Sequence, residues 1–363
     1  MIKRSKDKMT EQYYEIYAQA KARWDSIAKP IDSLGILEEH VCKLCAIAGD
    51  SRPYDLSKRA LVVLCADHGV VREGVTQTGS EVTRIVAENF AANCSSVNYM
   101  SGVAGVDVFS VDIGMQGESY PEKKIVQGKV IDRKVDYGTH NLAIEPAMTM
   151  QQCNKAIETG GEIVRELKQK GYNIICTGEM GIGNTTPSSV LAALLLNRTA
   201  ELVTGRGAGL DDKGLSTKKQ VVARSVDRLK KKQITDPVQM LAEVGGFEIA
   251  GMVGMYLEGV KERVPIVIDG AISSVAALVA TAIDARVPMY AFASHVSEEP
   301  IGVLVQKALR LPAMIHGKLC LGEGSGAVAL LPLLDMGLSV YKNMGTFDDL
   351  QIEAYDRTGK PVQ

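Results

Sequence analysis

Short, continuous apolar runs recur along the chain, and each is followed by a polar or glycine-rich turn. Runs of this kind are typical of parallel strands that are covered on both faces. Segments with helical spacing of their apolar positions lie between them, so the pattern predicts repeated βα units with right-handed crossovers. The expected strands are residues 59–66, 106–111, 173–176, 264–268 and 287–293. We therefore predict an α/β fold with helices on both faces of a mainly parallel sheet.

The first part of the chain has a different pattern. Residues 11–27 and 34–48 both carry apolar residues at helical spacing, Pro30 separates them, and Asp32-Ser33 is a candidate cap for the second helix. We expect this helical front end to be a small subdomain or a dimer arm. Further helices are expected at 81–98, at 149–171 with a Thr149–Gln152 capping box, and at 190–196.

Composition narrows the class of protein. The 363 residues are 46% hydrophobic and 23% charged, which is ordinary for a globular chain. The formal net charge of -2 gives no electrostatic reason to expect nucleic acid or an anionic membrane as a partner. The apolar runs are well short of the ~20 residues that a membrane span needs. Residues 1–9 are basic but no apolar core follows, so we expect no signal peptide.

The seven cysteines are scattered through apolar surroundings, as expected of buried thiols in a reducing cytosol. Cys42 and Cys45 form a CxxC, but no second pair or nearby histidine completes a zinc set. The pair also lies on an expected amphipathic helix. Packing is therefore the preferred interpretation, ahead of metal or redox use.

Residues 178–189, GEMGIGNTTPSS, are the main candidate for a binding site. Glycines at 178, 181 and 183 let the backbone approach a ligand closely, and the helix that follows would aim its free N–H groups at a phosphate. One acid, Glu179, lies where the strand meets the loop. On this segment alone, a plain glycine-rich βα turn is an equally good interpretation.

Three other segments carry candidate chemistry. Asp67-His68 follows the first strand, where ligands bind in open α/β sheets, although a cap for the next turn explains it as well. A second glycine-rich loop, 204–218, carries basic residues including Lys218, which in isolation are more often solvated than ligands. Glu323 is flanked by glycines, so partial desolvation would raise its pKa and suit it to general base catalysis; a helix N-terminal charge is the alternative.

Taken together, five motifs resemble those of the nicotinate-nucleotide:dimethylbenzimidazole phosphoribosyltransferase family of cobalamin lower-ligand synthesis. They occur in the family's order and spacing, and the resemblance runs from about residue 30 to about residue 345. The motifs are 67–70 (DHGV), 178–186 (GEMGIGNTT), 205–212 (GRGAGLDD), 269–270 (DG) and 321–327 (LGEGSGA).

The resemblance implies a three-layer α/β/α Rossmann-like fold with a small helical subdomain from the chain ends. The expected parts are residues 1–55 as the N-terminal helical part, 56–330 as the α/β catalytic domain, and 331–363 as a C-terminal helical segment packing with the small subdomain. It also implies a homodimer, or a heterodimer with a similar chain, in the cytoplasm.

The implied reaction transfers 5-phosphoribose from nicotinate mononucleotide to an aromatic base, inverts the anomeric carbon and releases nicotinate. Matched position by position, Glu323 would be the general base and Glu179 would lie close to the reacting ribose. No pyrophosphate leaves, so no metal and no cofactor are expected. The implied substrate-binding residues are Gly181, Gly183 and Lys218 for the 5′-phosphate, Gly270 and Ser297 on the nicotinate side, and also Asn184, Gly207 and Asp269.

The sequence departs from the family at two places near the presumed acceptor pocket. Gln77 to Ser80 replace a proline- or serine-bearing loop, and Cys320 stands where the family often has an arginine. Our hypothesis is a paralogue whose acceptor is another benzimidazole, a purine or a phenol.

Two other function classes compete with this interpretation. A nicotinamide-dependent dehydrogenase needs G-x-G-x-x-G and an acid about 20 residues on, whereas residues 178–183 read G-x-x-G-x-G and Glu201 has no matching strand. A non-catalytic or partner-dependent subunit of a heteromeric phosphoribosyltransferase stays open, although the presence of both Glu179 and Glu323 argues against it.

Overall fold

The computed structural model describes residues 8–355. The prediction that residues 1–9 are no signal peptide therefore concerns a segment that lies mostly outside the described residues. The chain divides into two compact units. One contains residues 57–330, and the other combines residues up to 56 with those from 331. The domain division expected from the sequence stays a prediction, because compactness alone does not show independent folding. Within residues 8–355, no helix combines the length and apolar character that crossing a membrane requires.

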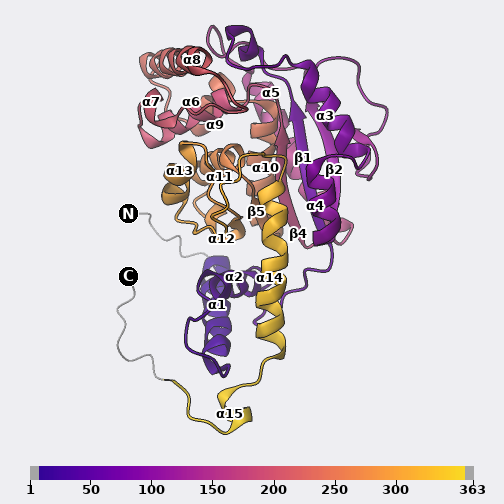
Figure 1. Ribbon diagram of the computed structural model, residues 1–363, viewed down its shortest axis with the longest axis vertical. Helices are drawn as coiled ribbons and strands as arrows, with labels where there is room; N and C mark the ends of the chain where they lie inside the picture. The colour runs from indigo at the N-terminus through magenta and orange to yellow at the C-terminus, as the bar shows by residue number, and fades with distance from the viewer. Residues whose placement is uncertain (1–7, 356–363) are drawn as a thin grey trace. The chain divides into compact units, whose positions relative to one another are not determined.

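The larger unit is built on six parallel strands in the order β3-β2-β1-β4-β5-β6 (Figure 1). The α/β fold with a parallel sheet predicted from the sequence is confirmed. The strand order reverses between β1 and β4, and the crevice at such a switch point is where open α/β sheets bind ligands. The strands are β1 (Arg59–Ala66), β2 (Val106–Gly114), β3 (Val130–Asp132), β4 (Ile174–Met180), β5 (Ile266–Ile268) and β6 (Ala291–Ala293).

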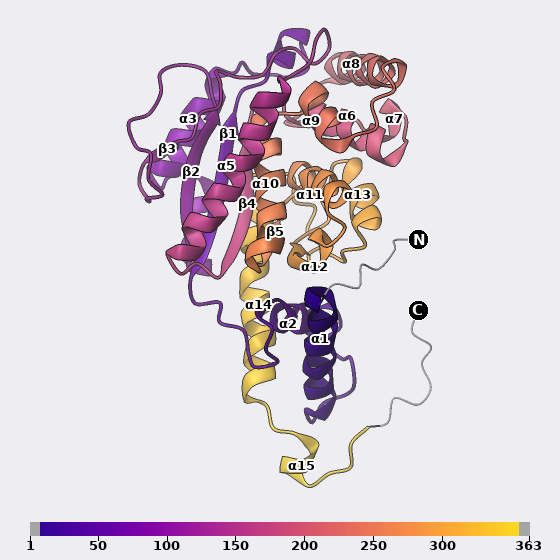
Figure 2. The same cartoon turned by 180° about the vertical axis from the view of Figure 1, so that it is seen from behind.

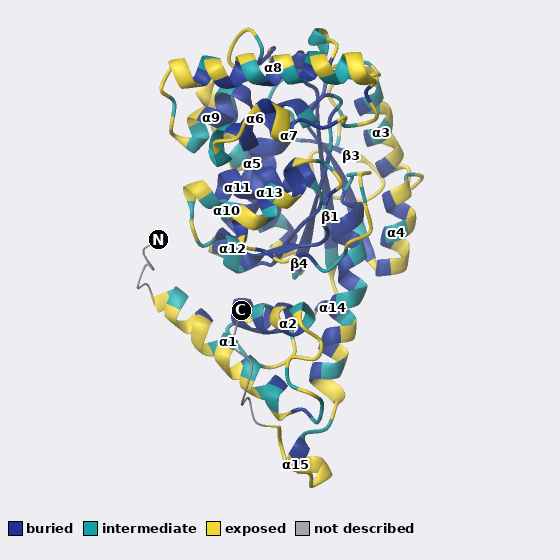
Figure 3. Cartoon of the chain, turned by 60° about the vertical axis from the view of Figure 1, so that its left-hand side comes forward, coloured by how far each residue is buried: buried dark blue, intermediate teal, exposed yellow. Residues whose placement is uncertain are grey.

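Helices cover both faces of this sheet, as Figures 1 and 2 show from opposite sides. Helices α3 (Glu81–Ala91) and α4 (Ser96–Ala104) lie over one face, and α5 (Met150–Gln169) and α10 (Phe247–Glu262) lie over the other. The strands are correspondingly buried, and β1 and β4 are dark blue in Figure 3 except at the first residue of β1 and the last of β4, which are of intermediate burial.

Helices α5 and α10 approach each other unusually closely because glycines form their contact. A Cβ added at Gly160 would lie 1.8 Å from the carbonyl oxygen of Gly251, and one at Gly254 would lie 1.9 Å from that of Ile157. The remaining helices of the larger unit are η1 (Gly69–Glu73), α6 (Thr185–Leu196), α7 (Ala200–Val203), α8 (Asp212–Lys231), α9 (Pro237–Val244), α11 (Ala271–Ile283), α12 (Val287–Tyr290) and α13 (Ile301–Leu309).

The smaller unit packs α1 (Lys8–Ser26), α2 (Ile36–Ala48) and the later part of α14 (Ser325–Asn343), followed by α15 (Phe347–Leu350). The Trp24 and Tyr341 rings lie 5.1 Å apart. Cys42 and Cys45 are both buried, and burial raises their pKa values to about 12 and about 11. Both thiols are therefore protonated and packed at neutral pH.

Several boundaries differ from the sequence prediction. The helix expected at 81–98 is two helices, because Asn93 adopts φ +56° and Ser95 starts α4 with its own capping box. Residues 287–290 form α12 rather than the start of a strand. The Asp32-Ser33 cap is also wrong, since the residue preceding α2 is Gly35, which provides no side-chain cap.

Candidate active site

A pocket of about 250 Å³ opens at the carboxyl ends of the strands, beside the switch point. Every part of its wall belongs to the larger unit. Its wall consists of residues 75–78, 179–185, 206–208, 270–272 and 319–323, together with Leu210, His295, Ser297 and Glu299. The first and second glycine-rich loops and the Glu323 segment therefore meet around one space, although they are far apart in the sequence.

Glu179 enters this pocket from β4, which runs on to Met180 instead of ending at Cys176 as expected. The Asn184 amide donates a hydrogen bond to Glu179 Oε2. Burial, together with the nearby charges of Asp269, Glu248 and Glu323, raises the pKa of Glu179 to about 8. In the free protein this group is therefore largely protonated at neutral pH.

Glu323 lines the same pocket and has an unusual backbone conformation. Gly322, Glu323 and Gly324 have φ values of +83°, +62° and +90°, and α14 begins one residue later. Among residues 8–355, Glu323 Oε2 is buried without a hydrogen-bond partner. Burial and then the charge of Asp269 raise the pKa of Glu323 above its ordinary value. An unpartnered carboxylate of raised pKa that faces a pocket is suited to accept a proton.

The Glu323 segment fits closely against β4 because Gly178 has no side chain. A Cβ at Gly178 would lie 2.7 Å from the Glu323 carbonyl oxygen and 3.0 Å from its carbonyl carbon. A Cβ at Gly322 would lie 2.9 Å from Glu179 Oε1. The two candidate catalytic glutamates are thus brought to neighbouring walls of the pocket by backbone contact between their segments.

Lys218 lies one layer behind the pocket rather than in its wall. Its side chain is fully buried, and Nζ donates to Thr185 Oγ1 at 2.6 Å. Burial lowers the pKa of Lys218 to about 8. The amine therefore reaches the pocket wall through Thr185, the first residue of α6, and the expected role of Lys218 in holding the 5′-phosphate stays a prediction.

Of the other expected binding residues, Gly181, Gly183, Asn184, Gly207, Gly270 and Ser297 all line the pocket. Gly207 has φ +56°, and its N–H donates to Glu299 Oε1 at 2.9 Å. Asp269 is not among the described residues that line the pocket. Its carboxylate accepts hydrogen bonds from the backbone N–H groups of Gly324, Gly326 and Ala327 instead.

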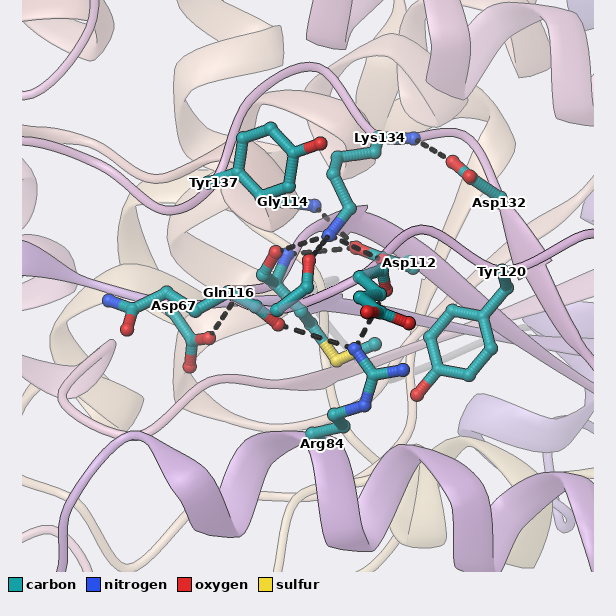
Figure 4. A network of polar contacts seen from close by, with 12 residues as sticks. Asp67, Arg84, Asp112, Gly114, Gln116, Tyr120, Asp132, Lys134 and Tyr137 are labelled. Atoms are coloured by element: carbon teal, nitrogen blue, oxygen red, sulfur yellow. Dashed lines mark hydrogen bonds and ion pairs between the residues drawn. The ribbon is translucent and has the colours of Figure 1, made fainter.

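The Asp67-His68 pair also lies outside this pocket. His68 Nε2 contacts Glu248 Oε1 at 2.8 Å, and both side chains are buried. Asp67 Oδ2 accepts from the Gln116 N–H at 2.7 Å, at the edge of a polar network that includes a Lys134–Asp112 ion pair of 3.2 Å (Figure 4). No cluster of three or more histidine, cysteine, aspartate or glutamate side chains suited to a metal ion occurs in the described part of the chain.

Comparison with known proteins identifies the family of the chain. A family model described as phosphoribosyltransferase matches residues 9–352. The nicotinate-nucleotide–dimethylbenzimidazole phosphoribosyltransferase of Acetivibrio thermocellus is 41% identical over 345 residues, which is 95% of this chain and 96% of the relative. The chain belongs to this family of phosphoribosyltransferases. The family and the enzyme class predicted from the sequence, a pentosyltransferase, are both confirmed.

Further relatives agree with this assignment. The enzyme of the same name from Ruminiclostridium cellulolyticum is also 41% identical, covering 96% of each chain. The crystal structure of CobT from Thermus thermophilus matches with a TM-score of 0.87 and 38% identity, covering 93% of this chain and 99% of that one.

Three acidic or histidine residues at or near this pocket were not predicted as site residues from the sequence. His295 and Glu299 line the pocket after β6, and buried Glu248 at the start of α10 affects Glu179 electrostatically. His295 and Glu299 stand in a polar segment after an expected strand, a signal that could have drawn attention to them. Glu248 had no such signal, since its proximity to Glu179 depends on how α10 packs.

Proposed function

We propose that the protein transfers 5-phosphoribose from nicotinate mononucleotide to an aromatic lower-ligand base, giving an α-riboside 5′-phosphate and nicotinate for cobamide biosynthesis. The observation that carries this proposal is the pairing of Glu323 and Glu179 on neighbouring walls of one pocket. The names of the relatives support the same reaction.

In the proposed reaction, the acceptor attacks the anomeric carbon from the face opposite nicotinate. The N-glycosidic bond breaks, and its electron pair returns to the pyridine nitrogen, so the leaving group needs no proton. The acceptor loses its proton to Glu323, whose raised pKa suits this transfer. Glu179 stabilises the positive charge that develops on the ribose, once the nearby pyridinium ring has favoured release of its proton to solvent.

The glycine-rich loop at the start of α6 is the proposed phosphate site. Gly181, Gly183 and Asn184 line the pocket just before the helix begins at Thr185, so the positive end of the helix faces the ligand. Lys218 supports this end through its hydrogen bond to Thr185 Oγ1. Gly207 borders the same side of the pocket, while Gly270 and Ser297 are proposed to contact nicotinate.

For the acceptor, we propose a base other than dimethylbenzimidazole: another benzimidazole, a purine or a phenol. Gln77 and Cys320, at the two places where the sequence departs from the family, both line the pocket. The Gln77 amide donates to the Gly209 carbonyl oxygen, so it joins two loops of the wall. These positions therefore shape the pocket directly.

The function is tested by incubating the purified chain with nicotinate mononucleotide and phenol, p-cresol, adenine or dimethylbenzimidazole, and measuring nicotinate release and riboside formation. We expect turnover with at least one acceptor. Strong preference for dimethylbenzimidazole would refute the acceptor proposal alone. Turnover only after a similar second chain is added would instead favour the partner-dependent subunit.

We also propose that the enzyme works in the cytoplasm as a dimer, either of two copies or with a similar chain. All seven cysteines are free thiols, which is typical of a reducing compartment. Light scattering of the purified chain, alone and with a candidate partner, would measure the mass of the assembly.

A further inference from the structure

We propose that Asp269 is a positioning residue, which holds the backbone around Glu323 in its active conformation and does not itself contact substrate. This inference rests on the proposed function, in which Glu323 is the general base. It gives Asp269 a role different from the substrate-binding role that the sequence suggested.

The Asp269 carboxylate binds the Glu323 segment through three backbone N–H groups. The N–H of Gly324 donates to Oδ2 at 3.0 Å, while those of Gly326 and Ala327 donate to Oδ1 at 2.7 and 3.2 Å. The carboxylate therefore joins the residue directly after Glu323 to the first turn of α14. Hydrogen bonds from backbone N–H groups to a buried carboxylate are charge-assisted, which makes them strong.

The Glu323 segment needs such a fixed attachment because its backbone is strained and its side chain is not tied down. A non-glycine residue at φ +62° is less stable than one in an ordinary conformation, and it persists only where its surroundings hold it. Glu323 Oε2 has no hydrogen-bond partner among the described residues, so that oxygen does not hold the segment. Backbone contacts and Asp269 are left to fix the position of the base.

Asp269 is itself held from two sides. It follows β5, and its N–H donates to Ser273 Oγ on α11 at 2.8 Å. The Ser294 hydroxyl, which follows β6, donates to the Asp269 carbonyl oxygen at 3.1 Å. Asp269 is only 1% exposed, so its carboxylate is presented to the Glu323 segment by the rigid end of the sheet.

The charge of Asp269 also acts on the base. The ionisable groups that interact with Glu323 are Asp269 after β5 and Glu179 on β4. Behind them, Glu248 on α10 acts on Glu179, and His295 after β6 acts on Asp269. After burial, Asp269 is the cause that raises the pKa of Glu323. Removing this charge while keeping the shape of the side chain therefore lowers the pKa of the base.

The primary test is Asp269→Asn. The amide oxygen can still accept from Gly326 and Ala327, but the amide NH₂ then faces the Gly324 N–H, donor against donor. Because small displacements of a catalytic group cost up to about 10²-fold in rate, we expect kcat to fall by about 10–10²-fold. We expect KM for nicotinate mononucleotide to stay unchanged, and the acid limb of kcat/KM for the acceptor to move to lower pH.

Three comparisons separate positioning from folding. Asp236→Asn is the matched control, because Asp236 also accepts a backbone N–H, from Gln239 at the start of α9, outside the pocket. It should leave kcat and the pH profile unchanged. Asp269→Glu keeps the charge, so its acid limb should stay in place while kcat falls. Thermal unfolding of each variant reports whether the chain still folds.

A second variant covers the case in which Asp269→Asn fails to fold. Ser273→Ala removes the hydroxyl that accepts from the Asp269 N–H, and should lower kcat without changing KM for nicotinate mononucleotide. A rise in this KM with kcat unchanged, in either variant, would overturn the inference and return Asp269 to substrate binding. An unmoved acid limb in folded Asp269→Asn would also overturn it.

Glu323→Gln, assayed in parallel, distinguishes a failure of the Asp269 inference from a failure of the base role proposed for Glu323. If Glu323→Gln is inactive but Asp269→Asn behaves like wild type, the inference fails and the proposed function stands. If Glu323→Gln keeps full activity, the base assignment fails, and the positioning role of Asp269 fails with it.

Discussion

Gly178→Ala offers a direct test of how tightly the structure fixes Glu323. Gly178 is a buried residue of β4, and its added Cβ would lie 2.7 Å from the Glu323 carbonyl oxygen and 3.2 Å from the Gly324 nitrogen. Ordinary contacts of a Cβ begin at 3.4 Å. These neighbours are backbone atoms, which cannot rotate away as the end of a flexible side chain would.

The contact is therefore about 0.7 Å too short, and the Glu323 segment must move away from β4 by about this amount. The strand cannot give way easily, because it pairs with β1 on one side and β5 on the other. Overpacking of this kind costs about 1–3 kcal/mol of stability. A base displaced by nearly 1 Å loses up to about 10²-fold in rate, so we expect a comparable fall in kcat.

The assay is the steady-state kcat for ribosyl transfer, with thermal unfolding measured on the same preparation. Gly102→Ala is the matched control, because Gly102 is an exposed residue of α4 with no atom within 4 Å of an added Cβ. That change should leave kcat unaltered and stabilise the protein by about 0.4–1 kcal/mol. Folded Gly178→Ala with the kcat of wild type would refute the reasoning, since the base would then not depend on this contact.

Three further predictions concern the ionisable groups of Glu323 and Lys218. Glu323→Gln should lower kcat by about 10²–10⁴-fold. In the wild type the acid limb of activity should lie above the ordinary glutamate value of 4.5, because the raised pKa means that the base is lost as pH falls through that higher value; an acid limb at or below 4.5 would contradict the base assignment. Lys218 has a pKa of about 8 in the fold against 10.5 in the unfolded chain, so the unfolded state binds more protons between these values and stability rises with pH there. Urea unfolding across this window should show that Lys218→Met removes a rise of up to about 3 kcal/mol, and an unchanged pH dependence in the variant would contradict it.

The sequence predicts those parts of the fold in which local pattern and tertiary environment agree. β1 is found at its observed bounds because residues 59–66 form one long apolar run. The second half of β4 is missed because Gly178 and Glu179 have low strand propensity, and pairing with β1 keeps them extended. β3 is missed because three edge residues, 130–132, become a strand only by pairing with β2.

The candidate site likewise contains some residues that the local sequence indicates and others whose role depends on tertiary packing. Glycines on both sides of Glu323 already indicate a carboxylate that is partly desolvated and open to a ligand, and Glu179 lies in a recognisable glycine-rich loop. Asp269 is visible as an acid at the end of a strand, but the sequence cannot tell whether such an acid faces ligand or backbone. That depends on where the first turn of α14 lies, which is set by packing between segments more than 50 residues apart.

The carboxylates around the pocket explain how the protonation state of Glu179 can change during the proposed reaction. Glu179 lies close enough to Asp269, Glu248 and Glu323 that placing a further negative charge on it is costly. The free protein lowers this cost by keeping Glu179 protonated, as its pKa of about 8 indicates. A ligand that brings positive charge to the anomeric carbon favours loss of that proton. At neutral pH a nearby cation therefore favours the ionised form of Glu179, so the site is expected to favour a pyridinium riboside over a neutral one.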